Sequence, residues 1–278
     1  MEFTLYVICT LILAALVCEL IDSSMGMLYG TILSPALIIV GFSPLVVIPS
    51  ILLSQALSGL TASFIHHRLK NAEFKLKIRS PKIIYASVQN VGYFETIRKG
   101  ISNDLRATLC IAVLGVIVTV TAVLVSVHIP PIALQTYIGV LVLAMGIILL
   151  SRLRFQYTWK KIFGLGLLSA FNKGISGGGF GPVATAGQII AGRNNGSSVG
   201  ATTLAEVPIC LTGFVTYVVV KGLADWSLPL YLTIGALLGA CLGPHVTAKF
   251  RDDKKLRKAL GVLVAALGVW TLLKVYVL

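Results

Sequence analysis

Charged residues are scarce in this chain of 278 residues: they make up 12 % of it, against about 25 % in typical soluble domains. Hydrophobic residues make up 56 %, and the mean hydropathy is +0.92. This composition excludes an ordinary soluble enzyme, a disordered chain and a coiled coil. It predicts an all-α polytopic membrane protein, and at roughly 20 to 25 residues per crossing the length allows about eight to ten membrane elements.

Acidic residues are scarcer still, with 10 Asp and Glu against 23 Lys and Arg and a net charge of +13. Nine of the basic residues fall between residues 66 and 106, and further groups lie at 152–161 and 249–258. Basic loops mark the cytoplasmic side of a membrane protein, so the charge needs no nucleic acid as a partner. We expect a multi-pass protein of the plasma membrane of a prokaryote, and the same rule predicts both termini on the extracytoplasmic side.

Motifs for metal, disulfide or catalytic chemistry are missing. The five cysteines lie in apolar runs and no C-x-x-C occurs, which argues against a zinc site or a disulfide framework. Neither a catalytic triad nor a nucleotide-binding loop is found, and the glycine-rich segment lacks the βαβ context of a dinucleotide site. We therefore expect no enzyme, no cofactor and no bound metal.

Two halves of the chain, residues 1–151 and 152–278, resemble one another. At a constant offset of 151 residues Gly26 matches Gly177, and Gln55 matches Glu206. The first half carries an additional basic cytoplasmic insertion at about 67–106, and loops that correspond in the two halves differ in charge. Such anticorrelated charge is typical of inverted repeats. We predict two inverted repeats of about five helical elements each, with broken helices near the membrane midplane.

Polar or glycine-rich segments interrupt two apolar runs, at residues 22–31 and 174–182. Unwound backbone within a membrane is tolerated where it lines a cavity or packs in protein, and the ends of half-helices can offer N–H groups and a positive dipole end to an anion. Close helix packing is the alternative explanation for the glycines. The residues expected to bind substrate are Lys173, Ser176, Gly177, Gly178, Gly179, Gly181, Ser23, Ser24, Gly26, Thr202 and Thr203.

Four ionisable residues fall at membrane depth: Glu19, Asp22, Lys173 and Glu206. Each is costly there unless it is paired or hydrated, so a functional role is the default. Lys173 is the candidate cation for an anionic substrate, and the offset places it opposite Asp22, as a possible partner. Asp22 or Glu206 could carry a coupling proton, with Glu19 and Gln55 nearby in the same site. A purely structural ion pair is the alternative.

Two further features have simpler explanations. Gly235, Gly239 and Gly243 form a stripe of small residues, which is typical of close helix packing in membranes. His66 and His67 lie beside Arg68 at the cytoplasmic end of a predicted span, and contact with lipid headgroups explains them more simply than metal binding.

The motifs resemble those of a known family. Residues 176–182 (SGGGFGP), Gly187, Gly192 and residues 199–206 (VGATTLAE) look like the second-half signature of the TauE/SafE sulfite exporter family, of the TSUP type. Residues 26–31 (GMLYGT), Pro35, residues 41–44 (GFSP) and residues 66–68 (HHR) are similar to its first-half counterpart.

This resemblance covers essentially the whole chain. It implies a membrane permease that exports sulfite, sulfoacetate or related small anions by alternating access. The expected partners are the anionic substrate, the lipid bilayer and, as one option, a second copy of the chain in a homodimer. Two alternatives stay open: a cation-coupled importer of organic anions that uses Glu19, Asp22 and Glu206 as cation ligands, and a membrane-embedded assembly factor that transports nothing.

Overall fold

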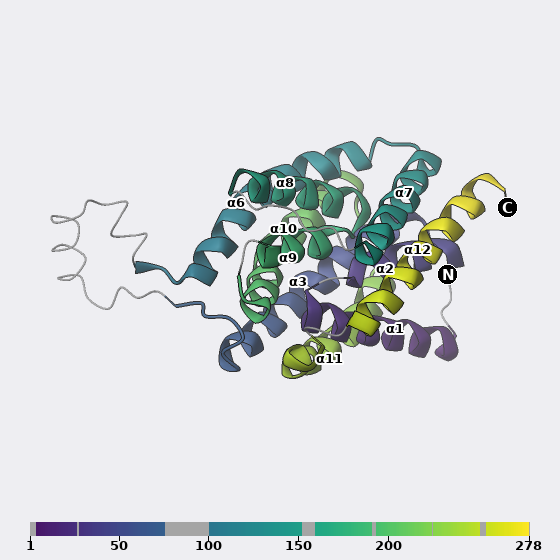
Figure 1. The fold of residues 1–278 in the computed structure, drawn as a ribbon. Coiled ribbons are helices and arrows are strands. Elements are labelled where there is room, and N and C mark those ends of the chain that lie inside the picture. The colour runs from purple at the N-terminus through teal and green to yellow at the C-terminus, as the bar shows by residue number, and fades with distance from the viewer. Residues whose placement is uncertain are drawn as a thin grey trace.

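The computed structural model describes residues 4–26, 28–75, 100–151, 159–190, 193–223, 225–250 and 254–277. Within these residues the chain forms ten helices (Figure 1). Most of the predicted basic insertion, residues 76–99, lies outside the described residues. The helices are α1 (Leu5–Met25), α2 (Tyr29–Val40), α3 (Pro44–Arg68), α6 (Asn103–Ser126), α7 (Pro131–Leu150), α8 (Trp159–Ser176), α9 (Phe180–Ile190), α10 (Asn195–Lys221), α11 (Ser227–Phe250) and α12 (Lys254–Tyr276).

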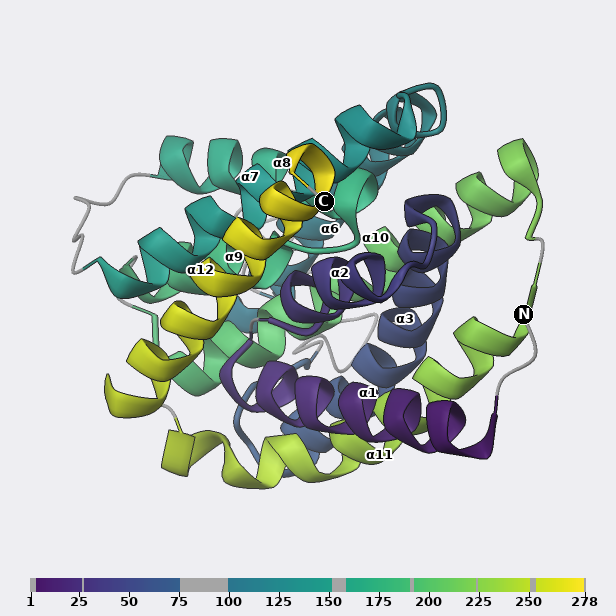
Figure 2. The same ribbon diagram turned by 90° about the vertical axis from the view of Figure 1, so that its right-hand side faces the viewer.

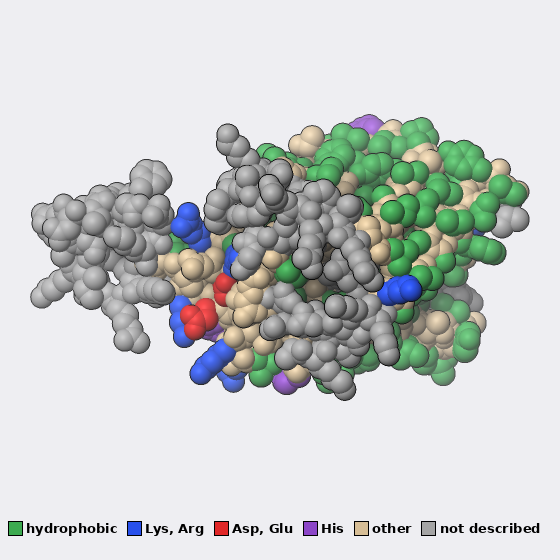
Figure 3. Space-filling model, in the orientation of Figure 1, with side chains coloured by type: hydrophobic (Ala, Val, Ile, Leu, Met, Phe, Trp, Pro, Cys, Tyr) green, Lys and Arg blue, Asp and Glu red, His purple; other side chains and the backbone are tan. Residues whose placement is uncertain are grey.

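Seven of these helices are long and apolar enough to cross a membrane: α1, α3, α6, α7, α10, α11 and α12. Helices α2 and α9 have only 12 and 11 residues, too few to span a bilayer core that needs about 20. The described part of the chain is therefore an all-α polytopic membrane protein, as its composition predicts. Hydrophobic side chains cover much of the face shown in Figure 3, whereas Lys and Arg side chains gather toward its left end, where α3 ends and α6 begins.

The order of helices in the first half is found again in the second. A helix that ends in a break (α1 or α8) is followed by a short helix (α2 or α9) and by three long ones (α3, α6 and α7, or α10, α11 and α12). The breaks correspond at the offset of 151 residues, because α1 ends at Met25 and α8 at Ser176.

Corresponding long helices pack on each other in opposite directions. Gly139 of α7 lies against Leu272 of α12, and Gly146 lies against Ala265. Residue numbers thus rise along α7 where they fall along α12, so the two helices are antiparallel. Figure 1 shows α7 and α12 side by side. Helices α3 and α10 are also in contact and antiparallel, since Gly59 lies against Val207 and Gly213 against Leu52.

The two broken helices pack on the other half of the chain. Helix α1 runs parallel to α11 (Figure 2), and Gly235, Gly239 and Gly243 let the two backbones approach closely, so the predicted packing role of this stripe is confirmed. In the same way α8 runs parallel to α6, with Gly174 against Ala122. Each broken helix thus packs on a helix of the other half, and corresponding long helices pack antiparallel on each other. This packing agrees with two inverted repeats, but the inverted arrangement and the orientation across the membrane stay predictions.

The orientation can be tested at the two corresponding turns. His128 lies exposed between α6 and α7, and Lys258 lies exposed near the start of α12. With the exposed Cys9 and Cys241 replaced by Ala, we expect an impermeant thiol reagent to label His128→Cys in intact cells and Lys258→Cys only after permeabilisation. Labelling of both positions from the same side would contradict the inverted arrangement.

Candidate functional site

The two helix breaks meet at the centre of the bundle. Gly26, which follows α1, has φ = 74°, and Gly177 and Gly179, which follow α8, have φ = 72° and 78°. These left-handed conformations are costly for residues with a Cβ atom. The glycines therefore let α1 and α8 stop in mid-bundle, and α2 and α9 begin a few residues later.

The backbones of the two breaks touch directly. A Cβ atom on Gly30 would lie 1.8 Å from the carbonyl oxygen of Gly177, and one on Gly178 would lie 2.8 Å from the carbonyl carbon of Gly30. Both distances are far below any contact that real Cβ atoms make, and the opposing atoms belong to the backbone, which has little room to move. Gly30 and Gly178 are therefore required by helix packing in this conformation.

Hydrogen bonds connect each break to the half-helix of the other. The Gly179 N–H group donates to Thr31 Oγ1 of α2 at 3.1 Å. In return Thr185 Oγ1 of α9 donates to the carbonyl of Gly26 at 2.8 Å. The breaks thus form one unit, and a movement of either half-helix must disturb the other.

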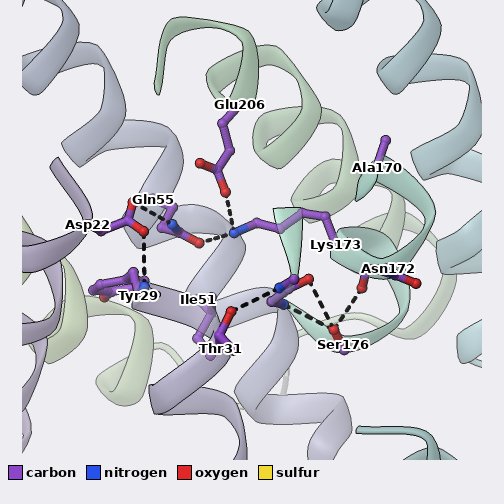
Figure 4. A network of polar contacts seen from close by, with 12 residues as sticks. Asp22, Tyr29, Thr31, Ile51, Gln55, Ala170, Asn172, Lys173, Ser176 and Glu206 are labelled. Atoms are coloured by element: carbon purple, nitrogen blue, oxygen red, sulfur yellow. Dashed lines mark hydrogen bonds and ion pairs between the residues drawn. The ribbon is translucent and has the colours of Figure 1, made fainter. Parts of the chain in front are cut away.

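A network of buried polar side chains lies beside this crossing (Figure 4). Lys173 Nζ, in the last turn of α8, forms an ion pair with Glu206 Oε1 of α10 at 2.6 Å and also donates to Gln55 Oε1 of α3. Gln55 Nε2 donates to Asp22 Oδ2 at 3.5 Å, and the Tyr29 N–H group donates to Asp22 Oδ1 at 3.0 Å. Five helices, α1, α2, α3, α8 and α10, therefore contribute to one network.

The partner of Lys173 differs from the one that the repeat suggested. Lys173 occupies the position of Asp22 in the other half, but its ion-pair partner is Glu206, and Gln55 lies between Lys173 and Asp22. The reason lies in the pairing of positions within each half. At the offset of 151 residues, Asp22 corresponds to Lys173 and Gln55 corresponds to Glu206. In each half, therefore, the residue at the break contacts the long helix that follows the short one.

Negative charge exceeds positive charge at this site. Among the described residues, the buried carboxyl groups here are those of Glu19, Asp22 and Glu206, and the ammonium group is that of Lys173; their residues are 1 to 6 % exposed. A buried carboxylate without a compensating charge is expensive. Protons or cations would balance this charge, and the role of these residues in ion coupling stays a prediction.

The backbone amides expected to bind an anion already have partners in this conformation. Gly177 N–H donates to the Lys173 carbonyl at 2.9 Å, and Gly178 N–H donates to Ser176 Oγ at 3.1 Å. The Gly179 amide is bonded to Thr31, as described above. The Gly179 amide could therefore reach a substrate only after the second break separates from α2, whereas the Gly177 and Gly178 amides would have to give up hydrogen bonds to α8.

The other expected binding residues are also buried. Ser23 and Ser24 hydroxyls donate to carbonyls within α1, and Thr203 donates to the Val199 carbonyl within α10. Thr202 Oγ1 accepts from Gln188 Nε2 of α9 at 2.8 Å. Of these residues, Thr202 thus links the second half-helix to α10, and the others turn toward their own helices.

His66 has a role that the sequence analysis missed. It is fully buried rather than placed among lipid headgroups, and its Nε2 donates to the Ser23 carbonyl at 2.8 Å. Asn71 Nδ2 lies 3.1 Å from His66 Nδ1 and donates to the Pro244 carbonyl of α11 at 2.9 Å. The corresponding contact in the second half is the Tyr217 hydroxyl, which donates to the Gly174 carbonyl at 3.4 Å. The signal in the sequence is that His66 and Tyr217 correspond at the offset of 151 residues, which marks the two positions without giving their partners.

Comparisons with known proteins point to one family. The sequence pattern of the sulfite exporter TauE/SafE family matches residues 82–271, a range that includes Lys173 and Glu206. A curated relative from Bacillus subtilis (strain 168), described as the probable membrane transporter protein YtnM, is 24 % identical over 265 residues, which cover 90 % of this chain and 76 % of that protein. No solved structure matches.

The close contact between the two breaks predicts how Gly→Ala substitutions there affect stability. We expect Gly30→Ala and Gly178→Ala to lower the free energy of unfolding by at least about 1–3 kcal/mol, because the added methyl group meets backbone atoms. Gly164 of α8 has no atom within 4 Å of an added Cβ, so Gly164→Ala should leave stability unchanged or raise it by up to about 1 kcal/mol. Thermal unfolding in detergent measures all three. A Gly178→Ala protein as stable as wild type would contradict the packing role.

Proposed function

Because the chain belongs to the sulfite exporter TauE/SafE family, we propose that it is a permease that exports sulfite or a related small sulfur-containing or organic anion across the plasma membrane. The observation that supports this most strongly is the Lys173 ammonium group, buried beside two helix breaks. Transporters build substrate sites from such discontinuous helices near the midplane.

Lys173 would bind the anion by exchanging one negative partner for another. Its Nζ atom now contacts the Glu206 carboxylate at 2.6 Å. The oxygens of sulfite, of a sulfonate and of a carboxylate accept the same charge-assisted hydrogen bonds from an ammonium group. Glu206 thus occupies the place of the substrate when the site is empty and closed, and a bound anion displaces it.

This exchange requires a proton. Once the substrate has replaced Glu206, the displaced carboxylate would stay buried without a partner, which is unfavourable unless it is protonated. Anion and proton therefore bind together, and the affinity for the anion rises as the pH falls. Alternating access follows when the two breaks separate, because their contact at Gly30 and Gly178 closes the centre in the described conformation.

The excess of carboxyl groups also supports a second function, import of organic anions together with cations. Glu19, Asp22 and Glu206 would then hold the cation, while Lys173 holds the anion. The two functions differ in the gradient that drives transport, so flux measurements with imposed proton and sodium gradients separate them. An assembly factor would show no flux in either case.

Removing the central ion pair should slow transport strongly. In proteoliposomes, we expect the double variant Lys173→Gln, Glu206→Gln to lose sulfite flux by about 10- to 100-fold, the loss expected for one charge-assisted hydrogen bond of about 1.5–3 kcal/mol. The double change avoids leaving one buried charge unpaired. Lys221→Gln, at an exposed position of α10, is the control. Normal flux through the double variant would place the anion elsewhere.

Changing Glu206 alone should have the opposite effect on binding. Glu206→Gln keeps the Lys173 ammonium but removes its competitor, so we expect tighter anion binding at neutral pH and a weaker pH dependence than in the wild type, whose affinity rises as Glu206 takes up its proton. Sulfoacetate is the suitable ligand for calorimetry, because its charge stays constant across the neutral range, whereas sulfite itself titrates there. An unchanged affinity and pH profile would show that Glu206 does not compete with the substrate.

A further inference from the structure

Glu19 differs from the other carboxyl groups of the site. Its residue is 1 % exposed, and its Oε2 atom has no hydrogen-bond partner among the described residues. Ser58 of α3 is fully buried, and its hydroxyl forms no well-formed hydrogen bond within the described part of the chain, although it lies close enough to the Glu19 carboxyl to interact with it. Two buried polar groups from α1 and α3 thus lie near each other without a well-formed hydrogen bond, and each unsatisfied group of this kind is costly.

The charge of the other two carboxylates is compensated. Glu206 is paired with Lys173 at 2.6 Å. Asp22 accepts hydrogen bonds from Gln55 and from the Tyr29 N–H group, which is the first N–H of α2 and carries the positive end of its dipole. Among the described residues, neither a cation nor a helix N-terminus forms an ion pair or hydrogen bond with the Glu19 carboxyl. The unbalanced negative charge of the site is therefore concentrated on Glu19.

The second half of the chain provides an internal comparison. At the offset of 151 residues, Glu19 corresponds to Ala170 and Ser58 to Ile209, and these two residues are buried in an apolar cluster. Gly115 of α6 packs against both of them, just as Gly239 of α11 packs against Glu19. Apolar residues thus fill these two positions in the second half. Packing alone therefore does not explain why the first half carries a carboxyl group and a hydroxyl group there.

We infer that Glu19 and Ser58 form a proton-binding site, separate from the Lys173–Glu206 pair, in which the Glu19 carboxyl is protonated while the site is closed. One proton removes the unbalanced charge and provides a donor from Glu19 to Ser58. A hydrogen bond from Ser58 to an ionised Glu19 would leave that charge in place. If the proposed function holds, this is a second coupling proton beside the one that Glu206 takes up, and it exchanges with water when the site opens.

A metal cation fits the site less well than a proton. Small hard cations take about six oxygen ligands, while both oxygens of the neighbouring Asp22 are already engaged. No group of three His, Cys, Asp or Glu suited to a metal occurs in the described residues. Several titratable or charged groups surround Glu19. They are Cys18 and Asp22 on α1, Tyr29 on α2, Lys173 on α8, and Glu206 and Cys210 on α10, while α11 presents glycine there.

Infrared spectroscopy tests the proton directly and needs no substrate. In the purified protein at neutral pH, we expect the carbonyl stretching band of a protonated carboxylic acid, with the small shift that deuterium exchange causes. The band should vanish in Glu19→Gln and persist in Asp22→Asn. Glu73→Gln is the matched control, because its side chain is 54 % exposed. Since Gln preserves the size of Glu, a folded variant is expected, and its melting curve verifies this.

Three results would overturn the inference: no such band in the wild type, a band that survives Glu19→Gln, or a band that disappears when sodium is added, which would assign the site to a metal cation. The coupling role has its own measurement in proteoliposomes that contain a pH-sensitive dye. Wild type should move more protons per sulfoacetate than Glu19→Gln, in which only the proton taken up at Glu206 accompanies the anion. An unchanged number of protons per anion in Glu19→Gln refutes that role, whereas a wild type that shows the band but moves no anion contradicts only the proposed function.

Discussion

The contact between Gly30 and Gly178 holds the site together. It joins two helix breaks from opposite halves of the chain at a distance that only glycine permits. Because each break is also the end of a helix, this one contact fixes where α1 and α8 stop and where α2 and α9 start. Asp22 and Lys173 lie one turn before these ends, so the crossing of the backbones brings their side chains into the same buried network.

The same two positions in each half carry different chemistry. Asp22 with Gln55 is a hydrogen-bonded pair, and Lys173 with Glu206 is an ion pair, although the backbone places both in the same relation to their breaks. A symmetric scaffold therefore holds an asymmetric charge distribution. The Gln55 side chain connects the two pairs, since it donates to Asp22 and accepts from Lys173, and a change in either pair is transmitted to the other through it.

Much of the fold could be predicted from the sequence, because membrane spans depend on local hydropathy and the breaks on local glycine and polar residues. The long spans, the two breaks and the burial of the four ionisable residues follow from such local signals. Partner choice does not, since it depends on the depth and rotation of each helix against its neighbours. His66 shows this, and so does Lys274, which interacts with the last carbonyls of α2, those of Ile38 and Ile39.

An anion site with more carboxyl groups than cations can work only with positive charge supplied from outside. In the proposed cycle the Lys173 ammonium alternates between Glu206 and the substrate, and every exchange leaves one carboxylate that needs a proton. Glu19 is a second carboxyl group that needs a proton, and it occurs only in the first half of the chain, because the equivalent position in the second half is Ala170. The two halves would therefore open with different proton demands, so the pH on each side of the membrane would affect the two openings differently, while the anion and proton gradients set the direction of net transport.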